Sequence, residues 1–197
     1  MNRTTLAAML AVVALAGSAR AQKSSNNIYI PPDAVNEQDA PGTALVDAFG
    51  HFCLHHFPGP ARMEDVAPGQ VTALPPARVR DFLHDDPGRG WVYKADGGEY
   101  VVTVEDPPYH TCAVRRTYAT PPRYRMPWLM LTGLWAASEG RGPFQDTPPQ
   151  TIQRDGMVIE AEGRTLKGAA EDLFLEIKTT YTNGRVEERL ARQAIGR

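Results

Sequence analysis

Three side chains spaced one helical turn apart could bind a metal ion together. They are Asp47, His51 and His55, each separated from the next by three residues. Two histidines at positions i and i+4 of a helix can both ligate zinc, as they do in metalloprotease helices. Phe52 stands where those enzymes carry the glutamate that acts as general base. A solvated helix face, with histidines near the negative end of the helix dipole, explains the same residues, so we assign no metal ligands.

A second group of side chains could recognise anions. Four arginines lie within eleven residues: Arg115, Arg116, Arg123 and Arg125. Guanidinium groups bind phosphates and carboxylates through paired hydrogen bonds, so an anionic glycan, a lipid headgroup or an acidic protein would fit them. We take these arginines as candidate anion-binding or partner-binding residues. Ion pairs between a surface strand and the acidic C-terminal segment explain them equally well.

A cysteine pair could form a disulfide or supply a nucleophile. Cys53 and Cys112 are the two cysteines of the chain, and an even pair in an oxidising compartment favours one disulfide. The bridge would close a loop of roughly 60 residues and stabilise the fold by about 4 kcal/mol at most. The alternative is a catalytic thiol at Cys53, beside the histidines at positions 51, 55 and 56. Oxidation would inactivate such a thiol, so we predict the disulfide.

Other catalytic motifs are missing from the sequence. It has no G-x-S-x-G elbow, no S-x-x-K, no phosphate-binding G-x-x-x-x-G-K and no C-x-x-C. The acidic pairs Asp85-Asp86 and Glu187-Glu188 are neighbours in sequence, so their side chains point apart and do not indicate a glycosidase. We therefore assign no catalytic residues.

The N-terminal 21 residues resemble a secretory signal peptide. Arg3 supplies the positive charge, residues 6–17 the apolar run, and Ala19-Arg20-Ala21 the cleavage site. The apolar run is shorter than the about 20 residues of a membrane span. We expect a mature protein that begins near Gln22, is periplasmic or secreted, and has no lipid anchor or transmembrane anchor.

Composition limits the remaining possibilities. Without the signal peptide the chain carries 19 basic and 23 acidic residues, a formal charge of −4, which does not suit a nucleic-acid partner. Residues 22–41 are polar and interrupted by proline, so we expect a flexible leader there. The length that follows suits a single domain over residues 42–197. No cofactor motif is present, and we predict no cofactor.

The periodicity of apolar residues predicts the elements that position these groups. Helical spacing covers residues 43–57, 76–84 and 127–139, and the first of these helices carries Cys53 on its apolar face. Trp128 and Trp135 make the third helix either a core element or a partner surface. Alternation of period two predicts a hairpin over 91–105, a strand over 110–118, and hairpins over 151–162 and 173–194. The charged return strand of the last hairpin is expected at an edge of the sheet.

This order of elements predicts an α+β fold with a mainly antiparallel sheet. In it, an N-terminal helix is tethered by the disulfide, and a central apolar helix separates two groups of strands. Those two groups leave room for a diverged duplication.

One stretch of the chain resembles a known class of proteins. Phe49, Cys53 and Pro58, followed by Trp91 and then by Thr111-Cys112-Ala113-Val114, are similar to the pattern of small uncharacterised secreted proteins of Gram-negative bacteria. Those proteins have a cysteine-bearing helix and a cysteine-bearing strand. The resemblance covers residues 43–118 and implies the disulfide, but no activity.

These observations favour an exported, non-enzymatic binding module. Its partner would be a protein or an anionic component of the cell envelope. The alternative is a metal-dependent or otherwise cryptic hydrolase that uses His51 and His55, together with His84 or His110.

Overall fold

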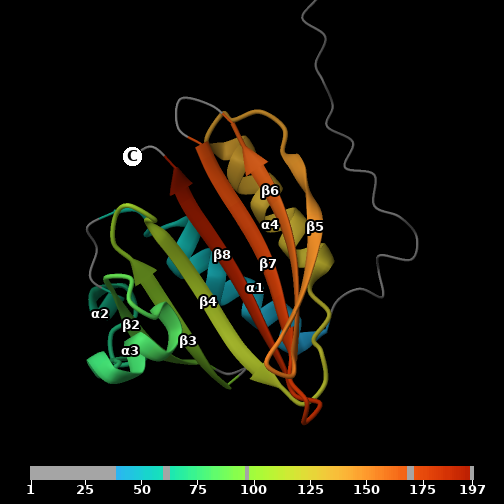
Figure 1. Cartoon of the computed structure of the whole chain (residues 1–197). Coiled ribbons are helices and arrows are strands. Elements are labelled where there is room, and N and C mark those ends of the chain that lie inside the picture. The colour runs from blue at the N-terminus through green and yellow to red at the C-terminus, as the bar shows by residue number, and fades with distance from the viewer. Residues whose placement is uncertain (1–38, 60–62, 96–97, 168–170, 196–197) are drawn as a thin grey trace, which may run out of the picture. The chain divides into compact units, whose positions relative to one another are not determined.

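The computed structural model describes residues 39–59, 63–95, 98–167 and 171–195 (Figure 1). The expected signal peptide, and the expected leader up to residue 38, lie outside the described residues. The last residues assigned to the leader, Ala40 and Pro41, open the first helix instead. Within the described ranges no helix has the length and apolar character needed to cross a membrane.

The fold is dominated by one antiparallel sheet of eight strands, in the order β1-β2-β3-β4-β8-β7-β6-β5. The strands are β1 (Val71–Ala73), β2 (Gly88–Ala95), β3 (Gly98–Glu105), β4 (Thr111–Tyr118), β5 (Gln145–Arg154), β6 (Met157–Leu166), β7 (Glu171–Thr180) and β8 (Val186–Ile195). Figure 1 shows helices α1 (Ala40–Phe49) and α4 (Arg125–Ser138) together on one face of this sheet. We call this the helix face. The α+β class and the antiparallel pairing are confirmed.

The chain order divides the fold into two similar halves. Each half starts with a long helix, α1 or α4, which is followed by a four-stranded antiparallel meander, β1–β4 or β5–β8. The halves join where β4 pairs with β8. This arrangement is the one expected of a diverged duplication. Short helices α2 (Met63–Val66) and α3 (Pro76–Leu83) are additions in the first half.

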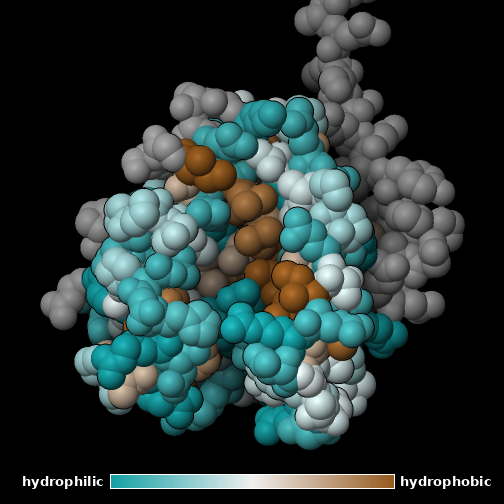
Figure 2. Space-filling view, in the orientation of Figure 1, coloured by the Kyte–Doolittle hydropathy of each residue, from teal (hydrophilic) through white to brown (hydrophobic). Residues whose placement is uncertain are grey.

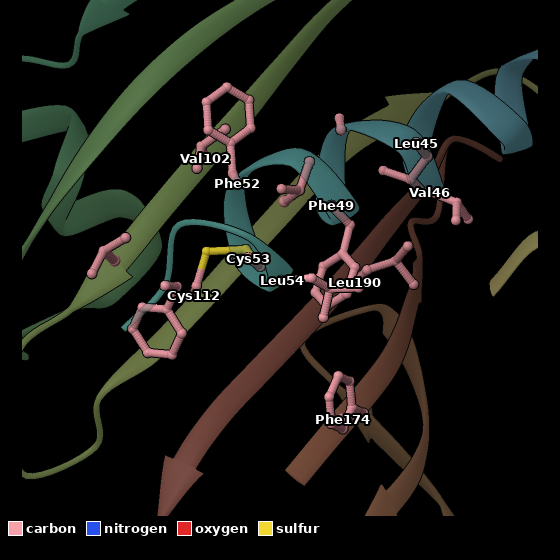
Figure 3. Packing of buried hydrophobic residues seen from close by; sticks show 14 of the residues in the cluster. Leu45, Val46, Phe49, Phe52, Cys53, Leu54, Val102, Cys112, Phe174 and Leu190 are labelled. Carbon is pink, nitrogen blue, oxygen red and sulfur yellow. A yellow bond between two sulfur atoms is a disulfide. The ribbon is translucent and has the colours of Figure 1, made fainter. Parts of the chain in front are cut away.

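Helix α1 begins earlier and ends earlier than its sequence pattern predicts. Asp39 caps its start, because a side-chain oxygen accepts a hydrogen bond of 2.8 Å from the Gly42 N–H. After Phe49 the chain continues as one π-helical turn, η2 (Gly50–Leu54). Figure 3 shows Phe49 of α1 and Phe52 of η2 pointing into the core, and the predicted Cys53–Cys112 disulfide tying η2 to β4.

Helix α4 packs with one side on the sheet and leaves the other side in solvent. Trp128 is 1% exposed, and its ring lies 4.7 Å from that of Phe49 in an edge-to-face contact. Trp135 is also buried, whereas Leu134 is 61% exposed. The tryptophans therefore belong to the core, and the outer side of α4 presents Met130 and Leu134 to water.

The prediction that the last strand forms an edge is wrong. β8 lies at the centre, between β4 and β7, and the edges are β1 and β5. Its Arg192 is only 2% exposed and pairs with the fully buried Asp172 of β7, at 3.0 Å between Nε and Oδ1. Arg192 also donates to the backbone oxygens of Cys53 and Phe57. The charge of Arg192 therefore belongs to a satisfied buried group and does not indicate exposure to solvent.

Candidate functional site

The face of the sheet opposite α1 and α4 is open and carries a continuous line of apolar side chains. Phe174 of β7 points toward the helices, so Leu173, Leu175 and Ile177 point to the opposite, open face. The cross-strand registers place neighbours beside them on the same face. We define the apolar track as Leu173, Leu175, Ile177, Ile159, Ile152 and Ile195. Ile152 is 52% exposed, Ile195 is 41% exposed, and the other four are partly exposed.

Small residues beside β7 make the track prominent. Leu175 is paired with Gly163 on β6 and with Ala191 on β8, so its side chain stands above both neighbours. Thr165, Thr179 and Gln193 place polar groups next to the leucines and isoleucines. Figure 2 shows the apolar track on the floor of a hollow between two polar flanks.

Helix α3 forms one of these flanks by covering β2 and β3 on the open face. The helix approaches the strand closely because β2 has glycine at position 88. A Cβ on Gly88 would lie 2.5 Å from a methyl group of Leu83, whereas one on Gly90 would be in ordinary contact, at 3.5 Å, with a methyl group of Val79. Part of the sheet is thus roofed by α3, while β8, β7 and β6 stay uncovered by the described residues (Figure 1).

Two arginines lie where the apolar track meets this roofed part. Arg115 of β4 is directly opposite Arg189 of β8, and Arg189 is directly opposite Ile177. Arg115 is 6% exposed; it donates a hydrogen bond of 3.1 Å to the Thr103 hydroxyl and lies 5.0 Å from the ring centroid of Phe82 on α3. Burial, reinforced by the positive charge of Arg189, lowers the pKa of Arg115 to about 10.

A second cluster of charged groups lies on the helix face, beside the start of α4. A cleft of about 310 Å³ is lined there by Tyr124, Arg125, Glu176, Lys178 and Glu188, with three neighbouring residues. The Tyr124 hydroxyl donates to Glu188 at 2.9 Å. Burial raises the pKa of both Glu176 and Glu188 to about 7. These carboxyls can take up protons near neutral pH. Most of the other charged groups around them already form ion pairs within the protein, so the cleft offers few charged groups to a ligand.

The four arginines singled out in the sequence do not form one patch. Arg115 lies on the open face, whereas Arg116, the next residue on the strand, lies on the helix face and stacks on Tyr100 and Tyr118. Arg123 pairs with Asp39, and Arg125 pairs with Glu162. These arginines are close in sequence but not in space, because the pleat of β4 points Arg115 and Arg116 to opposite faces and the turn after β4 carries Arg123 and Arg125 elsewhere.

The π turn also changes the histidine arrangement. In η2 each turn holds more residues than in an α-helix, so the ring 5.5 Å from that of His51 belongs to His56, while His55 is exposed. Asp47 is exposed on α1. His84 ends α3, and His110 packs against Phe57. Across the described ranges no group of three or more histidine, cysteine or acidic side chains could hold a metal ion.

Opposing effects act on the pKa of His51, and the lowering ones are larger, although a backbone hydrogen bond at Val66 raises it. Partial burial, with the charge of His56 as the next cause, lowers the pKa of His51. The zinc hypothesis depended on the α-helical i, i+4 spacing of His51 and His55, and Gly50–Leu54 is π-helical instead.

Comparison with known proteins finds no matching family model and no matching curated protein.

The sequence reasoning missed the open face and Arg189. One signal could have pointed to the open face: Leu173, Leu175 and Ile177 share one side of β7, while Phe174 lies on the other side. An apolar strand face needs cover, and the described residues leave this one open.

Proposed function

We propose that this protein is an exported binding module that holds a protein partner on the open face of its sheet. The apolar track carries this proposal, because monomeric proteins rarely leave a contiguous apolar surface in water unless something binds there. The track lies on β7 and on the paired strands β5, β6 and β8, and a hydrogen-bonded sheet suits a surface that must be preorganised before binding.

The chemistry of the open face favours a protein over a lipid or a small molecule. Apolar residues form its centre, and Thr165, Thr179, Gln193 and Arg189 stand around them, which is the anatomy of a protein interface: an apolar core with a polar rim. The hollow in Figure 2 is open along its length rather than enclosed. An apolar loop or strand of a partner fits this shape, whereas an acyl chain would stay half in water.

Two features support the exported location. The Cys53–Cys112 disulfide is of the kind that persists in oxidising compartments. The N-terminal 21 residues carry the charge, apolar run and cleavage site of a secretory signal.

Site-directed photo-cross-linking in the producing cell tests the function. p-Benzoylphenylalanine replaces Leu175 on the track or, as a matched control, Leu134, which is 61% exposed on the other side of the molecule. We expect a covalent product of one defined mass from position 175 and none from position 134. Adding Ile177→Asp should remove that product, because a buried charge at the centre of an interface costs several kcal/mol.

The outcomes separate the alternatives. A product with twice the mass of this chain would make the partner a second copy. Cross-links to lipid alone, equal products from positions 175 and 134, or a product that survives Ile177→Asp would each contradict the proposal. Circular dichroism and melting temperature verify that Ile177→Asp stays folded.

A further inference from the structure

Arg115 and Arg189 form a pair of like charges without a carboxylate partner. They face each other across β4 and β8, and neither forms an ion pair with an acidic side chain in the part of the chain that the structure describes. The Nε atoms of both are buried and have no hydrogen-bond partner there. Like charges opposite each other in a sheet are destabilising, and a buried donor without an acceptor costs further stability.

The arginine pair lies directly beside the apolar track. Arg189 is flanked by Arg115 on one side and by Ile177 of the apolar track on the other. A partner residue that contacts Ile177 therefore lies next to the position of Arg189. Arg115 lies between β3 and α3. It donates a hydrogen bond to the Thr103 hydroxyl of β3, and its guanidinium lies against the ring of Phe82 of α3.

We propose that Arg115 and Arg189 form an anion subsite that receives a carboxylate side chain of the protein partner. This inference rests on the proposed function and specifies its partner: an acidic residue next to the apolar residue that contacts Ile177. Arg189, the more exposed of the two, makes the contact through its forked N–H groups. Arg115 adds positive charge from beneath α3 and acts as a positioning residue.

The surrounding charges favour a single negative charge over a double one. Glu187 and Glu105 are the acidic groups that act on Arg115, and Tyr181 is the remaining titratable group nearby. The same three groups act on Arg189. The negative charges of Glu187 and Glu105 thus partly offset the positive charges of Arg115 and Arg189 from a distance, without forming an ion pair with either arginine. A singly charged carboxylate suits this balance better than a phosphate, which carries up to two charges at neutral pH.

Nuclear magnetic resonance of the full mature chain tests the subsite directly. The Nε–Hε signals of Arg115 and Arg189 are followed at pH 7 while sodium propionate, a carboxylate with a short apolar tail, is added at constant ionic strength. Sodium phosphate is titrated separately. We expect propionate to shift both signals in a saturable way and phosphate to do so at roughly tenfold higher concentration, a difference of about 1.4 kcal/mol.

Variants assign the effect to the pair. Arg189→Gln should abolish the shift at Arg115, and the control Arg185→Gln, at an exposed arginine immediately before β8, should leave both shifts unchanged. If Arg189→Gln does not fold, Arg189→Lys keeps the charge but loses the fork, and propionate should then bind severalfold more weakly.

Three results would overturn the inference. Tighter binding of phosphate would make the ligand a phosphorylated or envelope component rather than an acidic side chain. No saturable shift with either anion would eliminate the subsite, as would an equal loss of binding in Arg185→Gln. Cross-linking from position 175 does not depend on the arginines, so failure of the subsite and failure of the protein-binding function can be told apart.

Discussion

Glu176 is a carboxyl that the folded protein keeps at a cost, and its removal should stabilise the fold. It lies on the helix face of β7, directly opposite Glu162 of β6, and near Glu188 of β8. Burial, partly offset by Arg125, raises its pKa from 4.5 to about 7. The replacement Glu176→Gln keeps the shape of the side chain and removes the charge that burial disfavours.

The sign and size follow from the two pKa values. Between pH 4.5 and 7 the folded state binds a proton at Glu176 that the unfolded state has lost, so the free energy of unfolding falls as pH rises through this window. A shift from 4.5 to about 7 corresponds to about 3 kcal/mol at most. Since the glutamine also loses the attraction of Arg125, we expect Glu176→Gln to gain about 1–3 kcal/mol at pH 8 and little at pH 4.

Urea unfolding from pH 4 to pH 8 measures this effect. The wild-type protein should lose stability over the window, and Glu176→Gln should lose less; Glu188, whose pKa burial also raises to about 7, accounts for the remaining slope. Glu139→Gln, at an exposed position after α4, serves as the control and should follow the wild type. Equal slopes in wild type and Glu176→Gln, or a less stable Glu176→Gln at pH 8, would refute the reasoning.

Three further changes test the core. Asp172→Asn should destabilise the fold by about 3–5 kcal/mol in urea unfolding, because it leaves the buried charge of Arg192 without its carboxylate; a loss below 1 kcal/mol would show that the pair is not needed. Replacing both Cys53 and Cys112 by serine should cost up to about 4 kcal/mol, and treating the wild type with reductant should reproduce the loss. Gly42→Ala should lower the melting temperature, since its Cβ would collide with the backbone oxygen of Arg123; an unchanged value would mean that the start of α1 can move.

Local patterns predicted much of the fold. The turn at Asp155-Gly156 and the turn at Asn183-Gly184 both connect paired strands as expected, because glycine there takes the positive φ that such turns require. Two cysteines allow only one intramolecular disulfide, and the pairing holds. These features depend on short stretches of chain or on a count of residues.

Errors arose where a residue's surroundings come from distant parts of the chain. The charges of β8 suggested an edge strand, yet Arg192 is satisfied by Asp172, twenty residues earlier, and by η2, which is far away in sequence. The sequence pattern paired His51 with His55, yet the ring near His51 is that of His56, because the segment forms a π turn. The disulfide and the core packing of Phe49 and Phe52 set the path of this segment.

The sequence by itself determined the identity of most elements, the disulfide, and the alternation that puts Leu173, Leu175 and Ile177 on one face of β7. It could not determine whether that face would be covered, because cover depends on where α1 and α4 pack. Only the tertiary structure decided that both long helices lie on the same side of the sheet, which leaves the apolar track in water (Figure 1). It also brought together Arg115 and Arg189, which are more than seventy residues apart in the sequence. Periodicity is a property of neighbouring residues, whereas a binding surface is set by contacts between segments that are distant in the chain.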